Sequence, residues 1–211
     1  FKSSYLSLTL MTPLSAETAS ANALIPAVLR RGTAAHPDLE SLSAALDELY
    51  GGAIEPIVRK KGETQCVGFA ASFLDDAYAL LGELLLRPRT EKGMFYPDYV
   101  AGERSNLVDR IRAQVNDKRY YALSRLTQLM CEGEAFGVDK LGDEGRAAAL
   151  TPRKLWKRYQ ELLSTAEIEL YYCGSAAPDR VAEALSAALS GLPRSEERLE
   201  ADCEVRLHAG A

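Results

Sequence analysis

Apolar residues alternate with polar ones in several stretches of the chain, and this period of two predicts β-strands with one buried face. The strands predicted in this way cover residues 6–10, 53–59, 64–73 and 168–172. The second and third of these flank residues 60–63, so they form a predicted β-hairpin. A further alternation of Cys203, Val205 and Leu207 marks either a last strand or the start of a linker.

Apolar residues spaced three and four apart predict helices between these strands. The predicted helices cover residues 15–30, 37–49, 75–86, 152–163 and 178–189, and two consecutive helices lie within 96–132. Pro26 falls inside the first helix, where the missing N–H costs roughly 3 kcal/mol, so we expect a kink or a break there. The consecutive pair is interrupted near 115–118, and Asn116 or Asp117 is the expected cap of its second member.

The order of these elements favours the α+β class. The helices are grouped rather than alternating one for one with strands, which predicts a mainly antiparallel sheet with helices packed on one face. We assign residues 1–195 to a single domain of this class. Residues 196–211 are rich in acidic side chains and are interpreted as a tail or a linker toward a second half that is not present in this chain.

Composition narrows the classes of partner. The 211 residues include 30 acidic and 25 basic side chains, and the formal charge of -5 gives no net attraction to nucleic acid or anionic lipid. Apolar runs such as 78–86 fall well short of the roughly 20 residues of a membrane helix. We therefore expect no nucleic-acid partner, no membrane partner and a cytoplasmic location. Because the chain opens on Phe1 rather than Met, we expect it to be part of a longer gene product.

Motifs for nucleophilic or phosphate chemistry are absent from the sequence. It contains no G-x-S-x-G elbow and no glycine-rich phosphate loop. The four cysteines are scattered without a C-x-x-C pair, which favours buried apolar thiols over zinc or redox chemistry.

Several short runs follow one another in the order of a known family. They are Leu29-Arg30-Arg31-Gly32-Thr33, residues 47–52 before the hairpin, Glu103-Arg104, Leu150-Thr151, and residues 171–174 before an amphipathic helix. In this order the chain resembles the insulinase-type (M16) metallopeptidase family over nearly its whole length. The resemblance implies a domain like that of M16 peptidases and the mitochondrial processing peptidase, forming half of a bipartite subunit.

Active members of that family carry an inverted zinc motif, H-x-x-E-H, before the Gly-Thr pair. Counting back from Gly32, the three places fall on Ala23, Pro26 and Ala27. None of these side chains can bind zinc or accept a proton from water. The resemblance therefore implies that the zinc motif is lost from this helix.

The family's further Glu would fall at Asp109 or Arg110, and Arg110 is cationic. The two histidines, His36 and His208, lie too far apart in sequence to suggest a rebuilt site. We therefore expect no catalytic residue, no metal ligand and no cofactor in this chain. Zinc is expected only in a catalytic partner.

Similar chains without the motif serve in the family as non-catalytic halves that pair with an active one to enclose a chamber. The resemblance thus implies a chamber-forming or peptide-binding half, with a catalytic M16 homologue or a second M16-like half as partner. Two alternatives stay open: an active peptidase whose metal lies in another domain or subunit, and a plain scaffold. Arg30, Arg31, Lys60 and Lys61 are candidate contacts for a partner or peptide, although cations at a helix end and a solvated turn are the favoured explanations.

Overall fold

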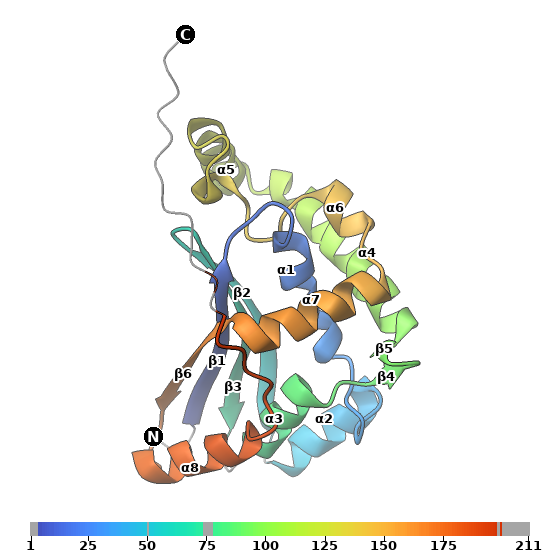
Figure 1. The fold of residues 1–211 in the computed structure, drawn as a ribbon, viewed down its shortest axis with the longest axis vertical. Helices are drawn as coiled ribbons and strands as arrows, with labels where there is room; N and C mark the ends of the chain where they lie inside the picture. Colours follow the sequence, from blue (N-terminus) through green and yellow to red (C-terminus); the bar gives the residue numbers. More distant parts are fainter. Residues whose placement is uncertain (1–3, 50, 74–77, 198, 200–211) are drawn as a thin grey trace.

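A four-stranded sheet forms one layer of the protein (Figure 1). The computed structural model describes residues 4–49, 51–73, 78–197 and 199. The strands of the sheet are β1 (Ser4–Pro13), β2 (Ala53–Lys61), β3 (Thr64–Phe73) and β6 (Glu167–Cys173). Their spatial order is β2-β3-β1-β6, and every neighbouring pair is antiparallel.

The helices cover one face of this sheet, as Figure 1 shows for α1, α3 and α7. They are α1 (Ala19–Leu29), α2 (Leu39–Glu48), α3 (Tyr78–Leu86), α4 (Pro97–Ala113), α5 (Lys118–Met130), α6 (Glu144–Ala148), α7 (Pro152–Thr165) and α8 (Pro178–Ala188). Short 3-10 turns, η1 (Gln114–Asn116) and η2 (Ala135–Gly137), flank α5. The predicted α+β class with helices on one face of an antiparallel sheet is confirmed.

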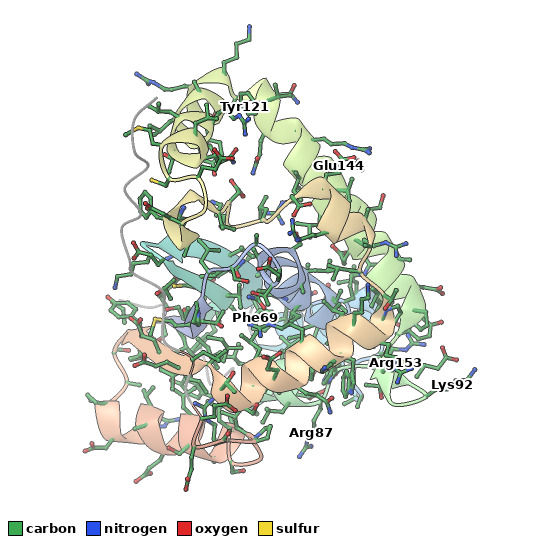
Figure 2. All side chains as sticks on the ribbon, turned by 45° about the horizontal axis from the view of Figure 1, so that its top comes forward. Phe69, Arg87, Lys92, Tyr121, Glu144 and Arg153 are labelled. Atoms are coloured by element: carbon green, nitrogen blue, oxygen red, sulfur yellow. The ribbon has the colours of Figure 1, made fainter. Side chains whose placement is uncertain are left out.

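The core lies between the sheet and the helices. On β1, Leu6, Leu8 and Leu10 point inward and are buried, whereas Tyr5 lies on the outer face and is exposed. Leu8 pairs with Phe69 of β3 in register, and both are fully buried. Figure 2 shows Phe69 in the middle of the molecule. The period-two pattern therefore chose the correct buried face.

Side-chain caps mark the start of several of the described helices. The Asp38 side chain accepts a hydrogen bond from the Ser41 N–H and forms a capping box with it. Asp117 caps α5 by accepting from the Tyr120 N–H, which confirms the second of the two predicted alternatives. Thr151 caps α7, with Pro152 at its first position.

Of the kink or break expected at Pro26, the break is wrong, because α1 runs through this residue to Leu29. Hydrogen bonds on either side are intact, from the Asn22 N–H to Thr18 O (2.9 Å) and from the Arg30 N–H to Pro26 O (3.0 Å). The helix packs against β3, α4 and α7. This packing outweighs the local cost of proline. The helix also starts later than predicted, at Ala19.

Two further differences concern hairpins. β2 continues to Lys61, so the turn is only Gly62-Glu63, with Gly62 at φ +61°. A second hairpin of β4 (Thr90–Glu91) and β5 (Met94–Phe95), turning at Lys92 and Gly93 with positive φ, was not predicted. It carries Phe95 into the core, where its ring centroid lies 5.1 Å from those of Trp156 and Tyr159.

The cysteines differ in exposure. Cys66 is buried, as predicted, and burial raises the pKa of its thiol. Cys173 is exposed because it lies opposite Tyr5 on the uncovered face of the sheet, so the expectation of burial is wrong there. The predicted start of the helix at residue 75 and the alternation over 203–207 lie outside the described residues. Within the described part of the chain, no helix is long and apolar enough to cross a membrane.

Candidate functional site

The helix that carries the three motif positions is the central helix of the domain. Every residue of α1 except Ala27 is buried, which is the pattern of a helix enclosed on all sides. Ala23 and Pro26 are within the core, and Ala27 is half-buried. The structure thus brings these three residues together on one short helix, with β3, α4 and α7 packed around it.

This environment does not fit a zinc ion. The three side chains offer two methyl groups and a pyrrolidine ring, which have no lone pairs for a metal. Among the described residues, no group of three or more His, Cys, Asp or Glu side chains could hold a metal ion. His36 lies in the loop after α1, where its backbone N–H donates to Thr33 Oγ1 (2.9 Å). His208 lies outside the described residues.

Arg30 and Arg31 tie the end of α1 to its neighbours. Arg30 Nε donates to the Ile54 carbonyl on β2 at 2.7 Å. Arg31 pairs with Glu103 of α4 at 3.4 Å, and its guanidinium lies 5.4 Å from the centre of the Tyr99 ring. In the described part of the chain, Arg30 Nη1 and Arg31 Nε are buried without a hydrogen-bond partner. Arg30 therefore connects the end of α1 to β2, and Arg31 connects it to α4.

Arg110 and its neighbour Asp109 lie near the end of α4, and both are exposed. The residues of α4 that are buried are Val100 and Leu107. Arg110 therefore lies on the solvent side of α4. The helix itself contacts α1.

Lys60 and Lys61 have different surroundings. The Lys60 ammonium donates to the carbonyls of Phe136 and Val138 (3.0 Å to the latter) and lies 4.6 Å from the centre of the Phe136 ring. Burial lowers the pKa of Lys60, and the charge of Asp139 opposes this shift. Lys60 therefore fastens the loop after α5 to the sheet. Lys61 is exposed at the end of β2.

A buried polar network beside α1 was missed from the sequence. Arg158 Nε donates to Asn22 Oδ1 at 2.7 Å, and Asn22 Nδ2 donates to Gln65 Oε1 at 2.7 Å. The Arg158 guanidinium also donates to Thr12 Oγ1 (3.2 Å) and pairs with Glu161 (3.1 Å). One signal was available, since Arg158 lies on the apolar face of α7 between Leu155 and Leu162.

The second missed feature is an apolar surface on α5. No residue of α5 is buried. The residues that we call the α5 apolar face are Leu123, Leu126, Leu129 and Met130, with exposures of 66%, 52%, 58% and 68%. Figure 2 shows Tyr121 of the same helix at the periphery of the molecule, far from Phe69. The sequence shows the apolar spacing, but only the fold shows that nothing in the described chain covers it.

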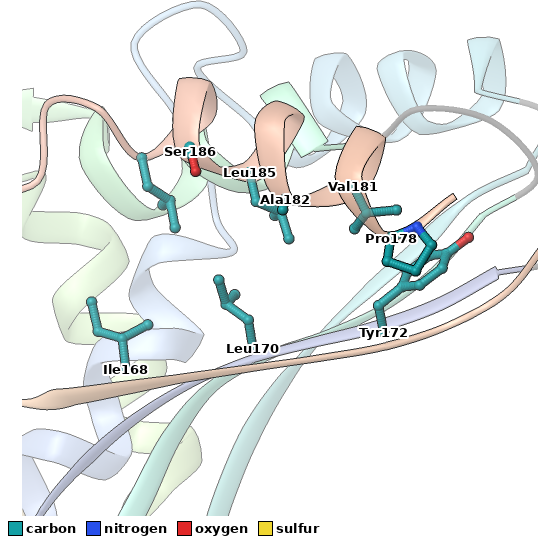
Figure 3. A pocket seen from close by; sticks show the side chains of 9 residues that line it. Ile168, Leu170, Tyr172, Pro178, Val181, Ala182, Leu185 and Ser186 are labelled. Carbon is teal, nitrogen blue, oxygen red and sulfur yellow. The ribbon is translucent and has the colours of Figure 1, made fainter. Parts of the chain in front are cut away.

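The third missed feature is a groove between α8 and the edge strand β6, with a volume of about 730 Å³. Figure 3 shows Ile168, Leu170 and Tyr172 of β6 on one side and Val181 and Leu185 of α8 on the other. Most of its lining residues are apolar, and Tyr172 and Ser186 add hydroxyl groups. We call it the β6–α8 groove.

The fold and the missing ligands together define a class, an M16-like domain without the zinc motif. The chain is 31% identical over 197 residues to the "Probable inactive metalloprotease YmfF" of Bacillus subtilis (strain 168), covering 88% of this chain and 46% of that protein. The resemblance to the insulinase-type (M16) family, in a form without the zinc motif, is confirmed. The chain spans about half the length of this relative.

Solved structures show the same fold. A conserved protein from Enterococcus faecalis V583 superposes with a TM-score of 0.85 at 23% identity, covering 94% of this chain and 49% of that one. The peptidase M16 inactive domain from Pseudomonas fluorescens gives a TM-score of 0.70 at 14% identity, covering 95% and 48%. No family model matches the chain. At these identities the structures establish the fold alone.

Proposed function

We propose that this chain is a non-catalytic M16-like half that pairs with a second M16-like half, with zinc chemistry confined to a catalytic partner. The observation that carries the proposal is the α5 apolar face, whose large side chains are more than half exposed. Contiguous exposed apolar side chains mark interaction surfaces on soluble domains. Since α5 contributes no buried residue to its own domain, pairing accounts for its apolar side chains.

The same proposal is supported by the lengths of the relatives, since this chain matches only about half of each. It corresponds to 46% of the Bacillus protein and 49% of the Enterococcus one, so both are long enough to contain a second domain of this size. In the proposed pair the two halves enclose a chamber that receives a peptide. Lys61 is exposed and is the candidate cation with most access to a peptide or partner, whereas Arg30 and Arg31 already contact Ile54 and Glu103. A cytoplasmic location belongs to the same proposal.

The test is association between the tagged full-length gene product and a second M16-like half, measured by sedimentation after isolation from the native cells. The double variant Leu126→Asp/Leu129→Asp is expected to weaken association at least about tenfold, because burying a charge in an apolar interface is costly. Its melting temperature should stay close to that of the wild type, since neither side chain is buried.

Arg125→Glu is the matched control, because Arg125 is exposed on the same helix and the change reverses a charge without removing apolar area. It should leave the association within about twofold of the wild type. Two results would contradict the proposal: the double variant associating as tightly as the wild type, or the wild type sedimenting with no M16-like partner. The second result would favour the plain scaffold instead.

A further inference from the structure

The helix α5 turns a polar side toward its own domain. The partly covered residues of α5 are Ser124, Thr127 and Gln128, whereas every residue of the α5 apolar face is more than half exposed. A surface helix is normally held on its domain by the burial of its apolar side chains. Since α5 buries none of these, other contacts must hold it in place.

The packing beneath α5 is loose. A hollow with a volume of about 220 Å³ separates α5 from β2 and from the segment around η2. Its walls include Tyr120, Ser124 and Thr127 on one side and Lys60, Phe136 and Val138 on the other. Figure 1 shows α5 beyond the end of the sheet at which β2 turns into β3. The contacts of α5 are mainly with η1 and η2, so its position depends on how these two turns are held.

Two side chains of the sheet hold the segment that follows α5. Lys60 of β2 and Gln65 of β3 are opposite each other in the strand register. The Lys60 ammonium donates to the carbonyls of Phe136 and Val138, and Gln65 Nε2 donates to the Lys140 carbonyl at 2.6 Å. Hydrogen bonds from a charged donor are stronger than neutral ones. Lys60 is therefore a strong attachment of η2 to the sheet.

The two ends of the α5 region are also joined to each other. Gln114 Nε2 in η1 donates to Asp139 Oδ1 at 3.4 Å, and the same oxygen accepts from the Leu141 N–H at 2.8 Å. Residues 114–139 thus form a closed segment, which we call the α5 unit. Because Lys60 reaches into this unit from the sheet, the loss of its ammonium should loosen the unit as a whole.

We propose that Lys60 is a positioning residue for the α5 apolar face. By holding η2 against the sheet, it fixes the α5 unit in the orientation in which this face meets a second M16-like half. The inference rests on the proposed function, and in it Lys60 acts only through α5. Lys61 is the matched control, because it is the next residue of β2, is exposed and points to the opposite face of the strand.

Amide hydrogen exchange tests whether Lys60 holds the α5 unit. It is measured in the full-length gene product carrying Leu126→Asp/Leu129→Asp, so that a partner does not mask α5 in any sample. Lys60→Met should speed exchange over residues 118–138 by about tenfold or more, because the carbonyls of η2 lose their charged donor. Lys61→Met should stay within about twofold of the parent, and exchange in the buried strand β3 should stay within about twofold in both variants.

Association tests the connection to pairing. Without the two Asp substitutions, Lys60→Met should weaken association with the second half by about threefold or more, because a loosened helix must be ordered again on binding. In the Leu126→Asp/Leu129→Asp background the same change should weaken it no further, since its influence passes through α5. A residue that touched the partner directly would weaken association in both backgrounds.

Three results would overturn the positioning role. In the first, Lys60→Met and Lys61→Met give the same exchange over residues 118–138. In the second, Lys60→Met speeds exchange in β3 as much as in α5, so that Lys60 supports only overall stability. In the third, Lys60→Met leaves association unchanged or weakens it equally in both backgrounds. A wild type with no M16-like partner would refute the proposed function instead, and the exchange rates would still decide whether Lys60 holds α5.

Discussion

Arg158 shows how a single charged side chain organises the interior. Its guanidinium reaches Asn22 on α1, Thr12 on β1 and Glu161 one turn further along α7. Asn22 in turn donates a hydrogen bond to Gln65 on β3. Gln65 Nε2 donates to the carbonyls of Ala19 (3.0 Å) and Lys140 (2.6 Å). A fully satisfied buried network of this kind fixes the relative positions of the elements that it joins.

Replacing Arg158 with Met keeps an unbranched apolar side chain but removes the donors. We expect Arg158→Met to lower the free energy of unfolding by about 1–3 kcal/mol, because the Asn22 oxygen is left buried and unsatisfied. Urea unfolding measures the change. The adjacent Lys157→Met is the control, since Lys157 is exposed and should change stability by less than about 0.5 kcal/mol. Equal effects of the two variants would contradict a structural role for the network.

Sequence reasoning at the residue scale succeeds where the physical cause is local. Asp38, Asp117 and Thr151 were identifiable because a capping side chain bonds to a backbone group within a few positions. The partners of Arg158 are more than a hundred residues away in the chain for both Asn22 and Thr12. No local pattern encodes such a contact.

At the scale of elements, α3 and α8 approach each other closely at Gly82. A Cβ atom on Gly82 would lie 2.5 Å from the Ala188 carbonyl oxygen, far inside van der Waals contact. Glycine is therefore required here to let the two helices meet. Because α8 forms one wall of the β6–α8 groove, the position of the groove depends on this contact.

Gly82→Ala should therefore destabilise the protein by about 1–3 kcal/mol, although alanine is the better helix former. Gly102 on α4 offers the matched comparison, because a Cβ there meets nothing within 4 Å. Gly102→Ala should stabilise by about 0.5–1 kcal/mol through helix propensity alone. Thermal unfolding of both variants decides the matter. A stabilised Gly82→Ala would show that α3 and α8 do not meet as described.

The main strands and helices were predictable from the spacing of their apolar residues, which face the core in most of these elements but not in α5. The β4–β5 hairpin was not, since its two-residue strands are too short to show alternation. The break expected at Pro26 is wrong for a different reason. Its local penalty was judged correctly, but the packing of α1 against three other elements could not be weighed from the sequence.

At the scale of the molecule, the lack of metal ligands predicts that the protein neither retains zinc nor becomes more stable when zinc is added. After dialysis, the purified chain is expected to retain well below one zinc ion per molecule. Its unfolding midpoint should not rise with added zinc, because stabilisation requires a site that binds the folded state. His36→Ala serves as the control for weak surface binding at that imidazole. Stoichiometric zinc retained in wild type and variant alike would refute the assignment.

We located the three places of the family's zinc motif in this sequence only from the order of the short runs around Gly32 and Thr33. What the sequence did not reveal is the state of the surfaces: that α5 exposes its apolar residues and that Leu170 lacks the cover that Leu8 has. Exposure is a property of the assembled layers. It becomes visible only when every element has been placed.

The pairing of β1 has a consequence for how the domain forms during synthesis. This first strand lies inside the sheet, between β3 and β6, and β6 is not made until residues 167–173 have emerged from the ribosome. Until then, the edge of Ser4–Pro13 that pairs with β6 lacks this partner and can meet other nascent chains. Ser7 and Thr9 alternate with leucine, so one face of β1 is polar during the period before β6 is made.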